Sequence, residues 1–247
     1  QVDMASNRID VWIEEVPAVS IAALRITPDI DRQRLSIDVK LRGGQAGQKY
    51  DVEAVASASG KKVASVRMRA GRSLTMLVSD PRLWTPRDPH LYDLTLHLYA
   101  DDALIDTVQS YFAMRKFALT DGPRGKRCFT LNGKELFLYG PPDQGYFPDG
   151  LYTAPSEAAM LFDIGYTKRI GCNMIRKHIK VEPQRWYYAC DRLGMIVWQD
   201  MPNGGLIDGD LIAGLSLTVG WYRNDRRRLQ RFGRAEEINR AQFREEL

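Results

Sequence analysis

The chain lacks the long apolar segments that mark membrane proteins. None of its 247 residues belongs to a run of about 18 apolar residues, the length that a transmembrane helix needs. The opening stretch, QVDMASNRIDVWIEEVP, also lacks the apolar core of a signal peptide. We therefore expect no membrane partner. Because a processed chain could have lost its leader, the compartment stays open, and we suspect the periplasm or secretion.

Cysteine is scarce as well. The three cysteines form no CxxC motif, and their number is odd, which argues against a disulfide framework. Cys172 and Cys190 lie inside apolar patterns, so they are expected to be buried free thiols, whereas Cys128 stands apart. No cluster of metal ligands is visible, and neither a metal ion nor a cofactor is expected.

Charge of one sign is only slightly in excess. The net charge is +4, and much of the basic surplus lies in YRNDRRRLQRFGR at residues 222–234. Such a run could bind a polyanion, or it could be a solvated helix face. Acidic residues follow at once from Glu236, and no recognition motif accompanies the arginines. We favour the solvated face and expect no nucleic-acid partner.

In the first half of the chain, apolar and polar residues alternate with a period of two. In RLSIDVKLRGG, apolar residues from Leu35 to Leu41 alternate with polar ones before a Gly-Gly turn. LYDLTLHLYADDALIDTVQSYF repeats the pattern around a plausible turn at Asp101-Asp102. About seven short strands over roughly a hundred residues predict an antiparallel β-sandwich of the immunoglobulin-like kind at residues 17–118.

The second half changes to alternating strands and helices. Apolar strands are predicted at GKELFLYGPP, CNMIRKH and MIVWQDMP. Between them, residues 156–171 form a helix with Ser156 as its N-cap, and residues 183–194 form a second helix that ends at Gly194. Near-continuous apolar strands separated by helices predict a parallel sheet that is covered by those helices.

Each of the three strands ends in polar residues. Because ligands of parallel α/β proteins bind at the carboxyl ends of strands, these ends are expected to converge on one site. An arginine there could hold a carboxylate or a sugar hydroxyl in fixed geometry. The candidate residues, in chain order, are Asp143, Gln144, Arg176, His178, Gln199 and Asp200.

Every candidate also has a structural explanation. Arg176 could form an ion pair that caps the sheet, and His178 could be a satisfied histidine beside a loop. The aspartates stand next to or near prolines, where Asp is a common turn former. Trp198 is the best candidate for stacking on a sugar, although packing in the core is the slightly better explanation.

Several ordered motifs resemble glycoside hydrolase family 2, which contains β-galactosidases, β-glucuronidases and β-mannosidases. They are LWTPRDPHLYDL, FTLNGKELFLYGPPDQGYFPDG, GCNMIRKH and YYACDRLGMIVWQDMP. The resemblance implies an immunoglobulin-like sandwich followed, at residues 119–247, by the first three βα units of a TIM (β/α)8 barrel. It also implies that residues 1–16 are the end of a jelly-roll domain and a linker.

The resemblance gives single residues a role. Arg176 matches the arginine that positions the catalytic nucleophile in this family, and Asn173 matches a typical asparagine. Gln144 falls where many β-galactosidases have a substrate-contacting histidine, and Asp143 replaces a typical arginine. His178 lies one position from the usual histidine. The Trp-Gln-Asp sequence at 198–200 is closer to β-mannosidases, so galactoside, glucuronide and mannoside remain open, with the first preferred.

Both catalytic carboxylates of the family are missing. The acid/base glutamate follows an asparagine at strand four and the nucleophile lies at strand seven, yet no Asn-Glu pair occurs here. We expect both beyond Leu247, so this chain should be an inactive fragment of a retaining exo-β-glycosidase whose partner is a carbohydrate. The alternative is a non-catalytic carbohydrate-binding or interaction protein of the same architecture, which could be a homo-oligomer.

Overall fold

The computed structural model describes most of the chain. The described residues are 15–45, 47–122, 125–200, 237–238 and 241. The Arg-rich run at 222–234 lies outside them, as do nearly all of the linker expected at residues 1–16 and most of the segment after the third predicted strand.

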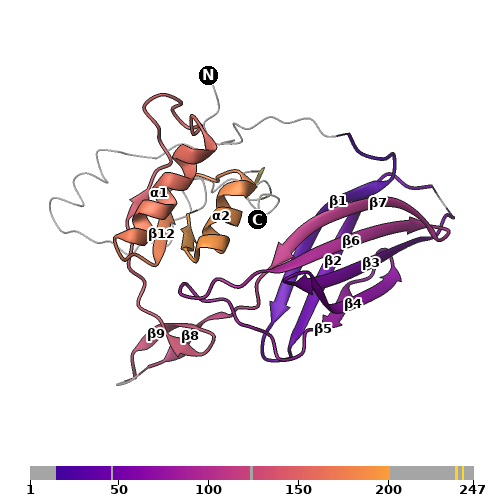
Figure 1. Cartoon of the computed structure of the whole chain (residues 1–247), viewed down its shortest axis with the longest axis horizontal. Coiled ribbons are helices and arrows are strands. Elements are labelled where there is room, and N and C mark those ends of the chain that lie inside the picture. The colour runs from indigo at the N-terminus through magenta and orange to yellow at the C-terminus, as the bar shows by residue number, and fades with distance from the viewer. Residues whose placement is uncertain (1–14, 46, 123–124, 201–236, 239–240, 242–247) are drawn as a thin grey trace.

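Seven strands form two antiparallel sheets that pack face to face (Figure 1). One sheet has the order β1-β2-β5, and the other has the order β4-β3-β6-β7. The strands are β1 (Ser20–Asp29), β2 (Arg34–Arg42), β3 (Tyr50–Ala58), β4 (Lys61–Arg69), β5 (Leu74–Leu77), β6 (Tyr92–Ala100) and β7 (Ala103–Phe112). One apolar core joins both sheets. The predicted antiparallel sandwich is thus present.

The alternation in the sequence decides which side chains enter this core. Leu35 and Ile37 of β2 are fully buried, and so are Leu96 and Leu98 of β6. Their neighbours in the sequence point to the other face of each sheet, since successive side chains of a strand alternate. Each fully buried leucine or isoleucine stabilises the fold by about 1.5–3 kcal/mol relative to an exposed one.

Asp101 and Asp102 form the predicted turn between β6 and β7. Their φ angles are +46° and +67°. Positive φ at both central residues is typical of a type I′ turn, whose twist matches that of the two strands it joins. Aspartate tolerates this conformation better than most residues, which explains its use here.

A small antiparallel sheet follows the sandwich. Its strands are β8 (Phe117–Asp121), β9 (Arg127–Leu131) and β10 (Lys134–Glu135), in the order β10-β9-β8. Asn132 and Gly133, with φ of +53° and +76°, form the turn between β9 and β10. The carboxamide of Asn132 also accepts a hydrogen bond from the Lys116 N–H and donates one to the Trp84 carbonyl, at 2.9 and 3.0 Å.

The last part is a parallel sheet with helices on one face. The order β11-β12-β13 joins β11 (Pro142–Asp143), β12 (Met174–Lys177) and β13 (Ile196–Gln199). The helices α1 (Glu157–Arg169) and α2 (Gln184–Leu193) lie side by side. Ile175 and Val197 pack against them in a second apolar core. The predicted alternation and the parallel pairing are confirmed.

The first predicted strand of this sheet is shorter than expected. GKELFLYGPP yields only β10, which pairs with β9, and the first residue of β11. Pro141 and Pro142 have no N–H to donate, so this segment cannot form a full ladder. The Asn173 carboxamide bridges part of the gap, since its oxygen accepts from the Tyr139 N–H and its nitrogen donates to the Phe137 carbonyl, both at 2.8 Å. Asp143 is the last residue of β11.

The helix ends follow the predicted signals with one difference. The Ser156 hydroxyl accepts a hydrogen bond from the Ala159 N–H at 3.1 Å, so Ser156 is the N-cap of α1. Gly194 ends α2 with a φ of +73°. Pro183 is the N-cap residue of α2, one position before the first turn for which it was predicted. Among the described residues, no helix is long and apolar enough to cross a bilayer.

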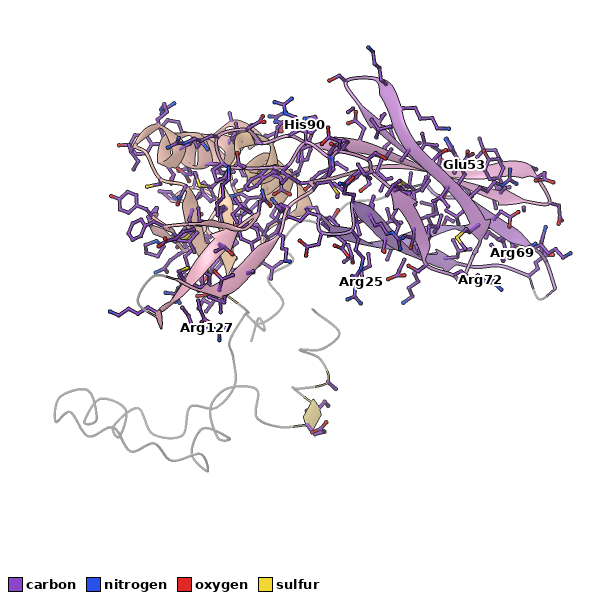
Figure 2. The ribbon with its side chains drawn as sticks, turned by 90° about the horizontal axis from the view of Figure 1, so that it is seen from below. Arg25, Glu53, Arg69, Arg72, His90 and Arg127 are labelled. Carbon is purple, nitrogen blue, oxygen red and sulfur yellow. The ribbon has the colours of Figure 1, made fainter. Side chains whose placement is uncertain are left out.

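A third apolar core joins the sandwich to the α/β part. It contains Trp84 and Ala113 from the sandwich side, Leu131 from β9 and Ile196 from β13. Trp84 precedes β6 in a loop that also carries His90, and Figure 2 shows His90 beside the helices, whereas Glu53 and Arg69 lie at the far end of the sandwich. The Lys168 ammonium of α1 donates to the Pro86 carbonyl of the same loop at 2.5 Å.

Asp191 of α2 receives three hydrogen bonds from the sandwich side. Its carboxylate accepts from Arg115 Nη1 at 2.6 Å and from the Tyr111 hydroxyl at 3.0 Å. Its backbone carbonyl accepts from Trp84 Nε1 at 2.7 Å. The Cys-Asp-x-x-Gly motif therefore joins the two parts of the chain, with Cys190 buried in the helix core and Gly194 at the helix end.

Candidate functional site

The carboxyl ends of the three parallel strands meet as predicted. The His178 N–H donates to the Asp143 carbonyl at 2.9 Å, and the Asp200 N–H donates to the Lys177 carbonyl at 3.0 Å. These bonds continue the parallel pairing just past the strands, so Asp143, Arg176, His178, Gln199 and Asp200 lie at one edge of the sheet. No strand on its own assembles these groups, because they come from separate parts of the chain.

Arg176 and Asp200 form a two-pronged ion pair at this edge. Nε and Nη2 of Arg176 donate to Oδ1 and Oδ2 of Asp200 at 3.1 and 2.9 Å. The arginine side chain is nevertheless 52% exposed. Such a planar fork fixes the guanidinium strongly, while its remaining N–H groups stay available to a carboxylate or hydroxyl ligand.

Lys177, the next residue of β12, points to the opposite face and is 1% exposed. Its ammonium donates to Asp143 Oδ2 at 2.6 Å and to Glu182 Oε1 at 2.7 Å. It also lies 4.4 Å from the centre of the Trp186 ring, where a cation is attracted by the face of the aromatic system. Asp143 is thereby held in place by a buried cation of the neighbouring strand.

Lys180 is a second buried lysine, in the loop after β12. Its ammonium donates to the carbonyl oxygens of Gly145 and Tyr152 at 2.8 and 2.6 Å. It also lies 3.0 Å from Glu182 Oε1. A buried ammonium is costly unless its donors are satisfied, and these three acceptors satisfy it.

The Gln199 carboxamide is used inside the protein. Its nitrogen donates to the Lys180 carbonyl at 2.8 Å and its oxygen accepts from the Tyr187 hydroxyl at 2.6 Å. Burial raises the pKa of Tyr187, which keeps its hydroxyl protonated as the donor of this bond. These contacts make Gln199 a residue that orders the loop after β12.

The remaining predicted residues have fewer contacts. Gln144 is exposed in the loop after β11, and His178 is partly buried. Trp198 is 43% exposed, and its ring meets that of Phe129 edge to face with centroids 5.5 Å apart. Trp198 is therefore neither a core residue like Trp84 nor a free surface residue, and one part of its ring remains open to solvent.

Lys177, Lys180, Glu182 and Tyr187 were not among the residues predicted for the site. A signal was present in the sequence, because KHIKVEP places two lysines and a glutamate directly after a core strand. Lysine is almost never fully buried unless it is paired, so surface positions were the natural expectation.

Charges at the strand ends balance within the described residues. Three cations, Arg176, Lys177 and Lys180, are paired with three carboxylates, Asp143, Glu182 and Asp200. In the part of the chain that the structure describes, no group of three or more His, Cys, Asp or Glu side chains is placed to bind a metal ion. The described arrangement is suited to recognition by hydrogen bonds from fixed donors.

Comparison with known proteins shows which family this chain is similar to. Residues 19–115 match the family model "Glycosyl hydrolases family 2". The resemblance to glycoside hydrolase family 2 is thereby confirmed.

Individual relatives cover most of this chain. A beta-galactosidase of Halalkalibacterium halodurans is 26% identical over 200 residues, which is 78% of this chain and 19% of the relative. A putative beta-glucuronidase of Formosa agariphila is 29% identical over 185 residues, 72% of this chain and 17% of the relative. The chain thus spans about a fifth of the length of these curated relatives.

Solved structures give the same result for the fold. A beta-glucuronidase of Parabacteroides merdae aligns with a TM-score of 0.66 at 24% identity, over 77% of this chain and 25% of that one. Beta-glucuronidase 3 of Bacteroides uniformis aligns with a TM-score of 0.63 at 26% identity, over 78% of this chain and 24% of that one.

Proposed function

We propose that this chain is part of a retaining exo-β-glycosidase, β-galactosidase-like as the first choice, and that it forms one side of the sugar-binding site. The observation that carries the proposal is the Arg176 guanidinium, which Asp200 fixes at the carboxyl ends of three parallel strands while half of the side chain stays exposed. A rigid donor at this position suits a sugar hydroxyl or the carboxylate of a catalytic glutamate.

The architecture proposed with this function has two parts. Residues 17–118 are an immunoglobulin-like sandwich, and residues 119–247 begin a (β/α)8 barrel of which β11, β12 and β13 are the first three strands. Parallel pairing with helices on one face supports this assignment. Residues 1–16 belong to a linker and the end of a preceding domain.

The catalytic carboxylates of the proposed enzyme lie outside this chain. A retaining mechanism needs an acid/base and a nucleophile with carboxyl groups about 5–5.5 Å apart. The chain contains no Asn-Glu pair to supply the acid/base. We therefore expect the chain alone to release no nitrophenol from 4-nitrophenyl β-D-galactopyranoside or from the corresponding β-D-glucuronide. Turnover by a preparation free of contaminating glycosidase would contradict this proposal.

The role of Arg176 is tested in the uninterrupted gene product. If its reading frame continues and the product hydrolyses a nitrophenyl glycoside, Arg176→Met should lower kcat/KM by about 100-fold, because misplacing one catalytic group has an effect of that order. Arg25→Met on β1 is the matched control, since Arg25 is an exposed residue of the sandwich. Equal activity of both variants would show that Arg176 is not part of the active site.

A second candidate function is a non-catalytic carbohydrate-binding or interaction protein. It is favoured by the fact that the Arg176–Asp200 pair and the lysine network form within this chain alone. Micromolar affinity for a sugar without turnover, together with a defined oligomer, would support it over the glycosidase.

A further inference from the structure

The loop that follows β11 forms a compact lobe between Gly145 and Tyr152. Phe147 and Leu151 pair across it, with each N–H donating to the other's carbonyl at 2.7 and 2.8 Å. Leu151 adopts a φ of +55°, which is uncommon for a residue other than glycine. The lobe is therefore an ordered structure with its own backbone hydrogen bonds.

Lys180 ties the two ends of this lobe together. Its buried ammonium, 3% exposed, donates to the carbonyls of Gly145 and Tyr152, the first and last residues of the lobe. The approach is so close that a side chain at Gly145 would lie 2.3 Å from Glu182 Oε1 and 2.8 Å from Lys180 Nζ. A larger residue at Gly145 would displace these two side chains, and its φ of +61° also favours glycine.

The chain around Lys180 is itself strained. Ile179 has a φ of +45°, which is a genuine outlier for a β-branched residue. Ile179 is 44% exposed and is not a core residue, so burial of its side chain does not explain the conformation. Residues held in such conformations cost about 1–3 kcal/mol and cluster at functional sites. The strain at Ile179 is what brings Lys180 under the lobe.

The lobe presents an aromatic ring to solvent. Tyr146 is 58% exposed, and its ring meets Tyr152 edge to face with centroids 5.7 Å apart. Tyr152 in turn lies 5.8 Å from the Lys180 ammonium. The Tyr152 ring thus orients Tyr146, and Lys180 holds Tyr152 in place. The rest of the Tyr146 ring remains exposed to solvent. A tyrosine of this kind offers an apolar face and a polar tip, which suits a ring that is apolar on one face and carries hydroxyls at its edge.

Taking the glycosidase or carbohydrate-binding function as given, we propose that Tyr146 is a sugar-stacking residue of the site, and that Lys180 is the positioning residue that holds its lobe. The ligand is the apolar face of a pyranose ring. The lobe directly follows β11 at the carboxyl ends of the strands, where the Gly145 N–H donates to Asp143 Oδ1 at 2.7 Å.

Another exposed aromatic pair, on α1, provides a control. Phe162 and Tyr166 of α1 are exposed and stacked, with centroids 5.9 Å apart. They lie on a helix that covers the sheet and not in a loop at the strand ends. Tyr166→Ala therefore removes an exposed tyrosine, 50% exposed, without touching the proposed site.

The test measures binding of methyl β-D-galactopyranoside and methyl β-D-glucuronide to the whole chain by saturation-transfer NMR and titration. Tyr146→Ala should raise the dissociation constant of the bound sugar at least fivefold, whereas Tyr166→Ala should leave it unchanged. If the chain binds a sugar and Tyr146→Ala binds it equally well, the stacking proposal is wrong and the proposed function stands. If the unmodified chain binds neither sugar, the stacking proposal is overturned, whereas the glycosidase proposal is decided separately by the activity of the longer gene product.

The role of Lys180 has a separate readout in amide hydrogen exchange. Lys180→Met keeps the aliphatic part of the side chain but removes all donors. We expect exchange over residues 145–152 to become at least tenfold faster, with the sandwich strands unchanged, and sugar affinity to fall as in Tyr146→Ala. Unchanged exchange in the lobe would overturn the positioning role. Should this variant fail to fold, Tyr146→Ala, which leaves the buried network intact, decides the proposal on its own.

Discussion

Lys177 illustrates how far a charged residue can enter the interior when every donor has a partner. Its ammonium is enclosed by Asp143, Glu182 and the face of Trp186. Attraction within such a network offsets the loss of hydration only while both signs of charge remain. If the Lys177 ammonium is removed, the carboxylates of Asp143 and Glu182 lose the cation that compensates their charge.

Lys177→Met is expected to destabilise the protein by about 3–5 kcal/mol, because an uncompensated buried charge has a cost of that size. The urea midpoint of unfolding measures the loss. Lys134→Met, an exposed substitution on β10, should change the free energy of unfolding by less than about 0.5 kcal/mol. A similar midpoint for both variants would show that the carboxylates find other partners.

The residues of the candidate site also show which contacts can be predicted from the sequence and which cannot. Arg176 and Asp200 could be predicted as neighbours, because each ends a strand of one parallel sheet. The pairing of Lys177 with Asp143 and Glu182 could not, since it depends on which face of β12 the lysine takes and on a loop conformation with Ile179 at positive φ. Neither is encoded in a periodic pattern.

Among the elements, α1 shows how a local signal fixes a boundary. The Ser156 hydroxyl satisfies one of the N–H groups that have no partner in the first turn. Ser156→Ala should therefore lower the free energy of unfolding by about 1 kcal/mol. Ser73→Ala, at an exposed position outside the strands, is the control and should have little effect. Equal midpoints of urea unfolding for the two variants would show that the Ser156 hydroxyl does not stabilise α1.

Strands and helices differed in how well the sequence predicted them. The sandwich strands have an alternating pattern from residues such as Leu35, α2 has an apolar stripe, and both helices have end signals such as Ser156 and Gly194, and these elements formed as predicted. The segment before β11 has apolar residues but ends in Pro141 and Pro142, and the Asn173 side chain supplements its few backbone hydrogen bonds to β12. A side chain that supplements backbone pairing leaves no trace in hydrophobic periodicity.

At the scale of the whole molecule, Asp191 connects the sandwich to the α/β part. Its carboxylate is the acceptor for both Arg115 and Tyr111, and it is only partly exposed. Asp191→Ala should reduce the free energy of unfolding by about 2–3 kcal/mol, because hydrogen bonds to a charged group are worth about 1.5–3 kcal/mol. The Asp191→Ala variant should also unfold on heating in two transitions, in place of a single one. A single transition at the original temperature would mean that the apolar core around Trp84 suffices to hold the parts together.

Tyr111 makes this junction sensitive to alkaline pH. Burial, together with the charge of Asp191, raises the pKa of Tyr111 above its ordinary value of about 10. Above pH 10 the unfolded chain therefore loses the phenolic proton while the folded protein keeps it. The folded state then binds more protons, so stability falls as pH rises, by up to about 1.4 kcal/mol per pH unit.

Tyr111→Phe keeps the ring that packs on Tyr188 but cannot ionise. It should be about 1 kcal/mol less stable than the unmodified chain at pH 8, through loss of the hydrogen bond, and about equal to it near pH 11. Urea unfolding of both proteins between pH 8 and 11 measures this difference, and a constant gap over that range would show that Tyr111 titrates alike in the folded and unfolded states.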